Sequence, residues 1–146
     1  MNANGASILT NPHPCGHIVY PYTDENLVGQ AVCLFASAGL RNREGVILIM
    51  TAAHCEAIRL RLQMEGLNLA SYERSGRLTC VTTEDLLARF IVNGTLHEDV
   101  FRSTISALID RVRASVSIGP ACEIRIFGEM VSQLRSADLT ATTRME

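Results

Sequence analysis

Short apolar runs alternate along the chain with longer segments in which apolar residues recur at helical spacing. Four runs are predicted to be strands: 16–20 (GHIVY), 46–50 (VILIM), 78–82 (LTCVT) and 122–127 (CEIRIF). The run 46–50 is apolar at every position, which is typical of a parallel strand covered on both faces. Strands that alternate with helical segments predict an α/β fold, here a three-layer domain with a mostly parallel sheet and helices on both faces.

The helical segments each carry apolar residues on one side. Between the first two strands the predicted core face is Leu27, Ala31, Leu34, Phe35 and Ala38. After Thr51, a candidate N-cap, the predicted core face is Ala53, Ala57, Leu60 and Met64, and Gly66 ends that helix. The string TTED (82–85) predicts a capped short helix that ends near Phe90, and Asn93-Gly94 predicts a turn. The segment 97–116 is the most regular amphipathic helix, with Phe101, Ile105, Leu108, Ile109 and Val112 on one side.

The pattern predicts one domain. Residues 1–15, rich in Asn, Pro and small polar side chains, are expected to form a flexible leader, and residues 16–146 the domain itself. The leader has neither the basic start nor the apolar run of a signal peptide. No apolar stretch approaches the ~20 residues that a membrane span needs. We therefore expect a cytoplasmic protein that does not enter the membrane.

Composition narrows the functional classes. The net charge is −2 and no basic block stands out, so we expect no direct contact with nucleic acid. All 13 basic residues are arginines, which leaves no lysine for a phosphate loop or a Schiff base within this chain. The five cysteines are odd in number and none has CxxC spacing, so we expect reduced thiols and no disulfide framework.

Three patterns are candidates for catalysis, and none is convincing. The string TAAHC (51–55) resembles the histidine box of chymotrypsin-like proteases, but the chain lacks a Gly-Asp-Ser-Gly nucleophile and the strands of that all-β fold, so we interpret the match as coincidence. The turn 21–26 (PYTDEN) has no glycine and no lysine where a nucleotide-binding α/β protein carries its phosphate loop. His54 and Cys55 are neighbours on a helix and point in different directions. We expect no enzyme activity.

Metal binding is a further possibility near the N-terminus. Cys15 and His17 alternate and would share one face of a strand, where both could contact a metal. Their spacing matches no established zinc signature, and Pro12 and Pro14 favour a loop. The prediction is therefore no metal and no cofactor.

Polar side chains gather at the predicted carboxyl ends of the strands, where open parallel sheets bind ligands. The candidate ligand-binding residues are His17, Tyr20, Tyr22, Thr51 and Glu129. For Thr51 helix capping is the alternative explanation. For Tyr22 and Glu129 a ligand contact and an internal hydrogen bond remain equally open.

Several strings together resemble one family. His17-Ile18-Val19-Tyr20, the acidic start TDEN, the segment GLRNREGVILIM, the segment 63–85 (QMEGLNLASYERSGRLTCVTTED) and the closing GEM (128–130) are similar to the MEDS domain, the methanogen/methylotroph, DcmR sensory domain. The similarity runs from about His17 to Glu146, and its most specific part lies between Gly66 and Thr82. The resemblance implies a RecA/KaiC-like core without a phosphate loop and a sensory role thought to concern small hydrocarbon derivatives.

The resemblance also implies an output partner, namely a DNA-binding, histidine kinase or anti-sigma module that serves signal transduction or transcription regulation in bacteria. The family pattern continues beyond GEM through a further helix and strand, and this sequence ends within that helix. We therefore expect a homodimer or larger homo-oligomer, with residues 129–146, or the sheet edge that they would have covered, at the interface. The expected function is non-catalytic sensing of a small ligand or partner. The alternatives are an oligomerisation module without a ligand and a nucleotide-binding protein with an unfamiliar site.

Overall fold

The computed structural model describes residues 3–13, 25–93, 95–116 and 123–129. Within these ranges the centre of the fold is a parallel three-stranded sheet in the order β2-β1-β5. Its strands are β1 (Gly45–Met50), β2 (Leu78–Thr82) and β5 (Ile124–Gly128). All six residues of the central strand β1 are buried, in agreement with the uninterrupted apolar run in the sequence. The predicted strand 16–20 lies outside the described residues.

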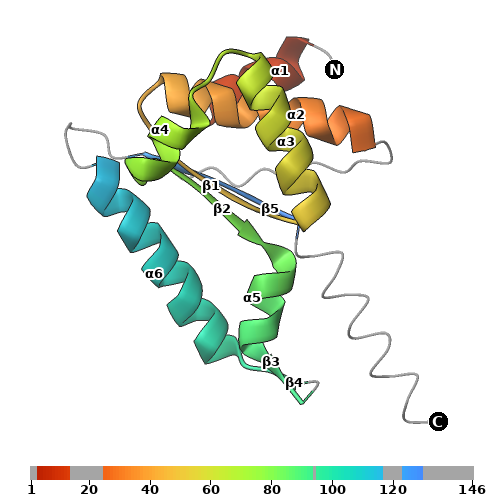
Figure 1. Cartoon of the computed structure of the whole chain (residues 1–146), viewed down its shortest axis with the longest axis vertical. Coiled ribbons are helices and arrows are strands. Elements are labelled where there is room, and N and C mark those ends of the chain that lie inside the picture. Colours follow the sequence, from red (N-terminus) through yellow and green to blue (C-terminus); the bar gives the residue numbers. More distant parts are fainter. Residues whose placement is uncertain (1–2, 14–24, 94, 117–122, 130–146) are drawn as a thin grey trace.

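Helices cover both faces of the sheet, so the predicted three-layer α/β architecture is confirmed (Figure 1). One face carries α1 (Ala3–Thr10), α2 (Glu25–Arg41), α3 (Ala52–Met64) and α4 (Leu69–Arg74). The opposite face carries α5 (Thr83–Phe90) and α6 (Glu98–Val116), which are joined by a short hairpin of β3 (Ile91–Val92) and β4 (Thr95–Leu96). The hairpin turns where Asn93-Gly94 predicts it, and Asn93 adopts a positive φ of 52°.

Local sequence signals set the ends of several helices. Thr51 and Thr82 cap α3 and α5, because each hydroxyl accepts a hydrogen bond from the backbone N–H three residues later. Gly66, with a φ of +83°, follows the end of α3, as the glycine signal predicts. The short helix α4, which begins after the N-cap Asn68, is absent from the sequence-based prediction.

The predicted core face of α3 is wrong, and that of α2 is right only in part. On α2 Ala31 is buried as predicted, but the most deeply buried apolar residues are Val32, Ala36 and Leu40, and Leu27 is 43% exposed. On α3 the buried residues are Cys55, Ile58 and Leu62, whereas all four predicted core residues, Ala53, Ala57, Leu60 and Met64, are exposed. Both helices carry a second apolar stripe, and only packing selects which stripe is buried. On α6 the prediction is confirmed, since Leu108 and Val112 are buried and the other three residues of the stripe pack against the same core.

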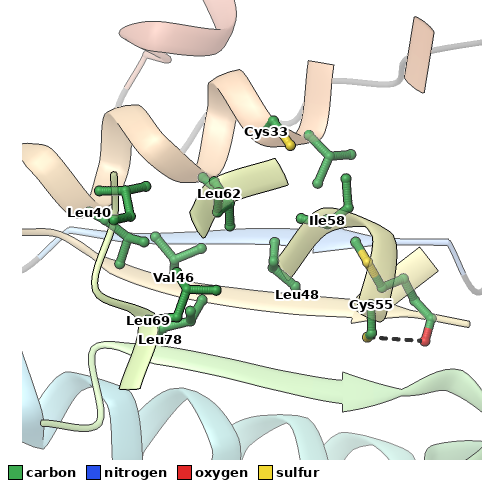
Figure 2. Close-up of a cluster of buried hydrophobic side chains, with 13 residues drawn as sticks. Cys33, Leu40, Val46, Leu48, Cys55, Ile58, Leu62, Leu69 and Leu78 are labelled. Carbon is green, nitrogen blue, oxygen red and sulfur yellow. Dashed lines mark hydrogen bonds between the residues drawn. The ribbon is translucent and has the colours of Figure 1, made fainter. Parts of the chain in front are cut away.

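The buried apolar side chains form two clusters, one on each face of the sheet. Figure 2 shows the cluster between the sheet and α2, α3 and α4, whose members include Leu48, Ile58 and Leu62. The cluster on the other face joins Ile47 and Ile49 of β1 to Phe90 and Val112. Because successive side chains of a strand point to opposite faces, β1 supplies the centre of both clusters.

Part of the predicted leader has regular structure. Residues 3–10 form α1, which packs on α2, and Arg125 of β5 holds its carboxyl end. The Arg125 guanidinium donates to the backbone carbonyls of Leu9 and Thr10 at 2.9 and 3.0 Å and pairs with the buried carboxylate of Glu44. A buried arginine can satisfy its donors in this way at the end of a helix, where backbone carbonyls lack partners within the helix.

Candidate functional site

Two adjacent strands end beside the first turn of α3. Thr51 directly follows β1 and begins α3, and its hydroxyl accepts a hydrogen bond from the His54 backbone N–H at 3.3 Å. Glu129 directly follows β5, and its own backbone N–H donates to the carbonyl of Ile49 at 3.0 Å. The parallel pairing of β1 and β5 therefore brings residues 78 positions apart in the sequence to one end of the sheet.

The Glu129 carboxylate binds to the start of α3. One oxygen accepts the Thr51 backbone N–H at 3.2 Å, and the His54 Nδ1 atom lies 2.8 and 3.0 Å from the two carboxylate oxygens. A carboxylate only accepts hydrogen bonds, so Nδ1 carries the proton and the Nε2 atom of His54 is the second polar atom that this pair presents. The Glu129 side chain is 5% exposed and the His54 side chain 31%, so the pair is closed on one side and open on the other.

A cavity of about 170 Å³ lies between α2 and α3 and ends at this pair. Most of its wall is apolar, and polar side chains stand at its ends. The apolar wall consists of Val28, Val32, Met50, Ala57 and Ile58, and the polar groups are Asn26, His54, Arg61 and Glu129. Apolar walls with a few convergent polar groups are typical of small-molecule sites.

Arg61 enters the cavity from α3 opposite Gly29 of α2. A Cβ atom at position 29 would lie 2.4 Å from Arg61 Nη1, so the guanidinium occupies the space that a side chain on α2 would need. His54, Ala57, Ile58 and Arg61 follow helical spacing and lie on one side of α3. One side of this helix therefore joins an imidazole, an apolar wall and a guanidinium.

The structure brings together two of the five ligand-binding residues that the sequence predicts. Thr51 and Glu129 lie together and are joined by a hydrogen bond, with Glu129 in the wall of the cavity. His17, Tyr20 and Tyr22 lie outside the described residues, as do the candidate metal ligands Cys15 and His17. No group of three or more His, Cys, Asp or Glu side chains that could hold a metal is found in the described ranges.

Sequence reasoning missed three residues of the cavity: Asn26, His54 and Arg61. In the sequence alone, His54 stands out only as part of the protease-like string TAAHC and as a neighbour of Cys55. The spacing of positions 54, 57, 58 and 61 indicates one helix side, and that signal was available. The sequence does not show that α2 packs against this side of α3 and thereby makes it a cavity wall.

The cysteines of the described part of the chain are poor nucleophiles. Burial raises the pKa of Cys33 and of Cys80 to about 11, and it also raises that of Cys55. The Cys55 thiol lies 3.9 Å from the backbone carbonyl oxygen of Met50 (Figure 2). A thiol with a raised pKa stays protonated near neutral pH, and the thiolate is the reactive form.

Comparison with known proteins gives one match. The model of the family described as MEDS, the methanogen/methylotroph, DcmR sensory domain, matches residues 16–146. No curated protein and no solved structure matches the chain. Among the described helices, none combines the length and the apolar character required to cross a membrane.

Proposed function

The chain belongs to the MEDS family of sensory domains, and on this premise we propose that it senses a small molecule that binds in the cavity between α2 and α3. The observation that carries the proposal is the cavity itself, an apolar space with charged groups at its ends, at the carboxyl end of a parallel sheet. Thr51 and Glu129 take part as the groups that fix the His54 imidazole at one end. We extend the proposed site to His17, Tyr20 and Tyr22, which precede α2 in the sequence.

The size of the cavity favours a small ligand. Pockets for drug-sized molecules usually measure about 300–1,000 Å³, and this one measures about 170 Å³. A nucleotide would require more space and a phosphate cradle, and the turn 21–26 has neither glycine nor lysine. These observations support a small organic molecule over a nucleotide. The raised pKa values of the three described thiols support a function without covalent catalysis.

The His54–Glu129 pair provides a route from the cavity to the rest of the molecule. Glu129 is bonded to β1 through its backbone and to α3 through its side chain. A ligand that contacts His54 changes the balance between these bonds and thereby shifts the population of two arrangements of the chain at the end of β5. In our proposal residues 130–146 pass this shift to an output partner.

The partners follow from the same proposal. The output module is a kinase, an anti-sigma protein or a DNA-binding domain in the cytoplasm of a bacterium, and a homodimer presents two sensing sites to it. No direct contact with nucleic acid is needed, in keeping with the net charge of −2. The competing function is an oligomerisation module that binds no ligand.

A thermal-shift screen of small organic molecules tests the proposal with a matched pair of variants. Ala57 lines the cavity at its exposed rim, so Ala57→Leu narrows the cavity, whereas Ala53→Leu adds the same side chain at an exposed position of the same helix outside the lining. A ligand at about 100 times its Kd stabilises the folded chain by about 2.7 kcal/mol, which corresponds to a rise in Tm of several degrees. We expect this rise in the wild type and in Ala53→Leu, and its loss in Ala57→Leu.

Two outcomes would count against the proposal. A ligand that stabilises both variants equally binds somewhere other than the cavity. If no compound raises the Tm and light scattering shows a stable homo-oligomer, the chain is an oligomerisation module without a ligand.

A further inference from the structure

We propose that the ligand is a small carboxylic acid whose carboxylate binds the Arg61 guanidinium and whose apolar body fills the cavity between α2 and α3. The inference rests on the proposed function, because it assigns a chemical class to the ligand of that cavity. It is carried by four observations on Arg61 and its surroundings: its missing carboxylate partner, the glycine opposite it, the apolar wall beside it and the groove that leads to it.

Arg61 has no carboxylate partner among the residues that the structure describes. Its closest polar contact is the Asn26 side-chain oxygen, at 3.5 Å from Nη2. Five other arginines in these ranges form ion pairs: Arg41, Arg59, Arg102, Arg113 and Arg125. Glu65 lies one helical turn beyond Arg61 and is paired with Arg41 at 3.5 Å. A guanidinium carries five N–H donors in a planar fork that matches a carboxylate, so Arg61 retains most of its donors for a ligand.

Gly29 of α2 leaves open the space that the Arg61 guanidinium occupies. A glycine in the middle of a helix weakens that helix, because it adds backbone freedom to the unfolded chain. The position is nevertheless a glycine in the buried part of α2, and any larger residue would push its Cβ atom to within 2.4 Å of Nη1. The pairing of a helical glycine with a guanidinium on the facing helix therefore keeps the positive charge at the cavity.

The rest of the cavity fits the body of a small acid. Val28, Val32 and Ile58 are each at most 5% exposed and form a dry wall beside the guanidinium. An apolar cavity of about 150 Å³ admits a molecule the size of benzene, and this cavity measures about 170 Å³. The space therefore suits a chain of about four to six carbons or a single ring.

The Glu129 carboxylate, at the His54 end of the cavity, does not oppose the binding of a carboxylate at Arg61. His54 and Arg61 are seven residues apart on α3, which separates them by about 10 Å along the helix axis. The Glu129 carboxylate is bonded to His54 and to the Thr51 N–H, so its charge has local partners. An acid with its carboxylate on Arg61 would direct its apolar end toward His54.

A route to Arg61 from solvent is present. The same side chain lines an open groove of about 480 Å³ beside α2 and α3, together with Gln30, Leu34, Met64 and Glu65, whose carboxylate is paired with Arg41. The guanidinium therefore lies between the groove and the cavity, where it can meet an anion from solvent before the apolar body enters.

Titration calorimetry with matched probes tests the inference on the full chain. The probes are sodium hexanoate and 1-hexanol, which share a six-carbon chain and differ in the charged head. We expect hexanoate to bind the wild type at least tenfold more tightly than hexanol. The variant Arg61→Gln should lose at least tenfold in hexanoate affinity and change hexanol affinity less than twofold.

Two further variants keep the test independent of folding defects. Arg111→Gln removes the same charge from an exposed position of α6, on the other face of the sheet, and should bind hexanoate like the wild type. Gly29→Ala keeps the arginine but displaces its guanidinium, so it should weaken hexanoate binding even if Arg61→Gln fails to fold.

The outcomes separate this inference from the proposed function. Equal affinity for hexanoate and hexanol, or full hexanoate affinity in both Arg61→Gln and Gly29→Ala, overturns the carboxylic acid and leaves a cavity-binding sensor in place. If neither probe binds the wild type, the inference also fails, and the library screen with Ala57→Leu then decides the proposed function by itself.

Discussion

The two faces of the sheet are built from the same strand but carry different chemistry. Ile47 and Ile49 of β1 point toward α5 and α6, where they join a cluster of apolar side chains and where Thr83, the first residue of α5, is also buried. Val46, Leu48 and Met50 point toward α2, α3 and α4, where the apolar cluster is bordered by buried charges. On that side lie the Arg125–Glu44 pair, the His54–Glu129 pair and the cavity with Arg61.

We infer that the α5/α6 face serves the stability of the domain, whereas the α2/α3 face also serves ligand recognition. A close-packed apolar face can stabilise the fold without any polar requirement. Charged groups beneath a helix must instead be paired and hydrogen-bonded, which limits the arrangements they can adopt. We therefore expect changes on the α5/α6 face to alter stability alone, and changes on the α2/α3 face to alter stability and ligand binding together.

The largest effect is expected from Phe90→Ala on the α5/α6 face. Phe90 is fully buried and meets the Phe101 ring edge-to-face at 5.1 Å between centroids. Removing a buried phenylalanine costs about 3–5 kcal/mol through lost burial and the cavity left behind, and urea unfolding measures that loss. Ligand affinity of the remaining folded protein should stay within twofold of the wild type. A large change in affinity would show that the two faces are coupled.

A loss of similar or slightly smaller size is expected from Arg125→Met on the α2/α3 face. The change leaves Glu44 buried without its partner and the carbonyls of Leu9 and Thr10 without a donor. Breaking a buried pair costs about 3–5 kcal/mol. The double variant Arg125→Met, Glu44→Leu should recover much of the free energy of unfolding, because no unpaired charge remains. Equal destabilisation of the single and double variants would show that the pair is not the cause.

Two N-cap variants, one on each face of the sheet, should lower the free energy of unfolding by similar amounts. Thr51→Ala and Thr82→Ala each remove one hydroxyl that accepts a backbone N–H, at 3.3 and 3.1 Å. Each should lower the free energy of unfolding by about 1 kcal/mol. Only Thr51→Ala should also weaken ligand binding, because its cap fixes the turn that holds His54 against Glu129. Equal ligand affinity in the two variants would show that the Thr51 cap does not contribute to ligand binding.

The smallest effect concerns the thiols of buried Cys33 and partly buried Cys80, and it appears only at alkaline pH. The pKa of Cys33 and of Cys80 rises from 9.0 to about 11 on folding, with burial as the main cause. Alkylation of these two sites, followed by mass spectrometry, should be slow at pH 8 and increase about tenfold per pH unit until near pH 11. Glutathione, measured in parallel, should reach its plateau about two units earlier.

The same shift links pH to stability. A thiol whose pKa is raised in the folded state contributes stability that is fully present below pH 9 and is lost as the pH rises toward about 11. Rapid alkylation of Cys33 and Cys80 at pH 8 in the folded protein would show that the α2 side of the sheet opens readily, contrary to its dense packing.

Interactions between neighbouring residues account for the elements that the sequence predicts correctly. The apolar run at 46–50 and the alternation at 122–127 correspond to β1 and β5, and the hydroxyl caps Thr51 and Thr82 begin their helices. These signals are local, because a cap bonds to the next turn and an uninterrupted apolar strand requires cover on both faces wherever it lies. The three-layer α/β class followed from their order.

Packing between distant segments selects the buried helix faces and brings the charged groups together. Leu60 and Met64 form an apolar stripe on α3 as regular as that of Cys55, Ile58 and Leu62, and the approach of α2 and the sheet selects the second. Glu129 is placed at His54 by the parallel pairing of β1 and β5, across 75 positions of sequence. Arg61 becomes a cavity wall because Gly29 of another helix faces it. Each of these contacts joins two segments that are distant in the sequence. The local pattern of one segment does not predict the position of the other, because that position depends on packing.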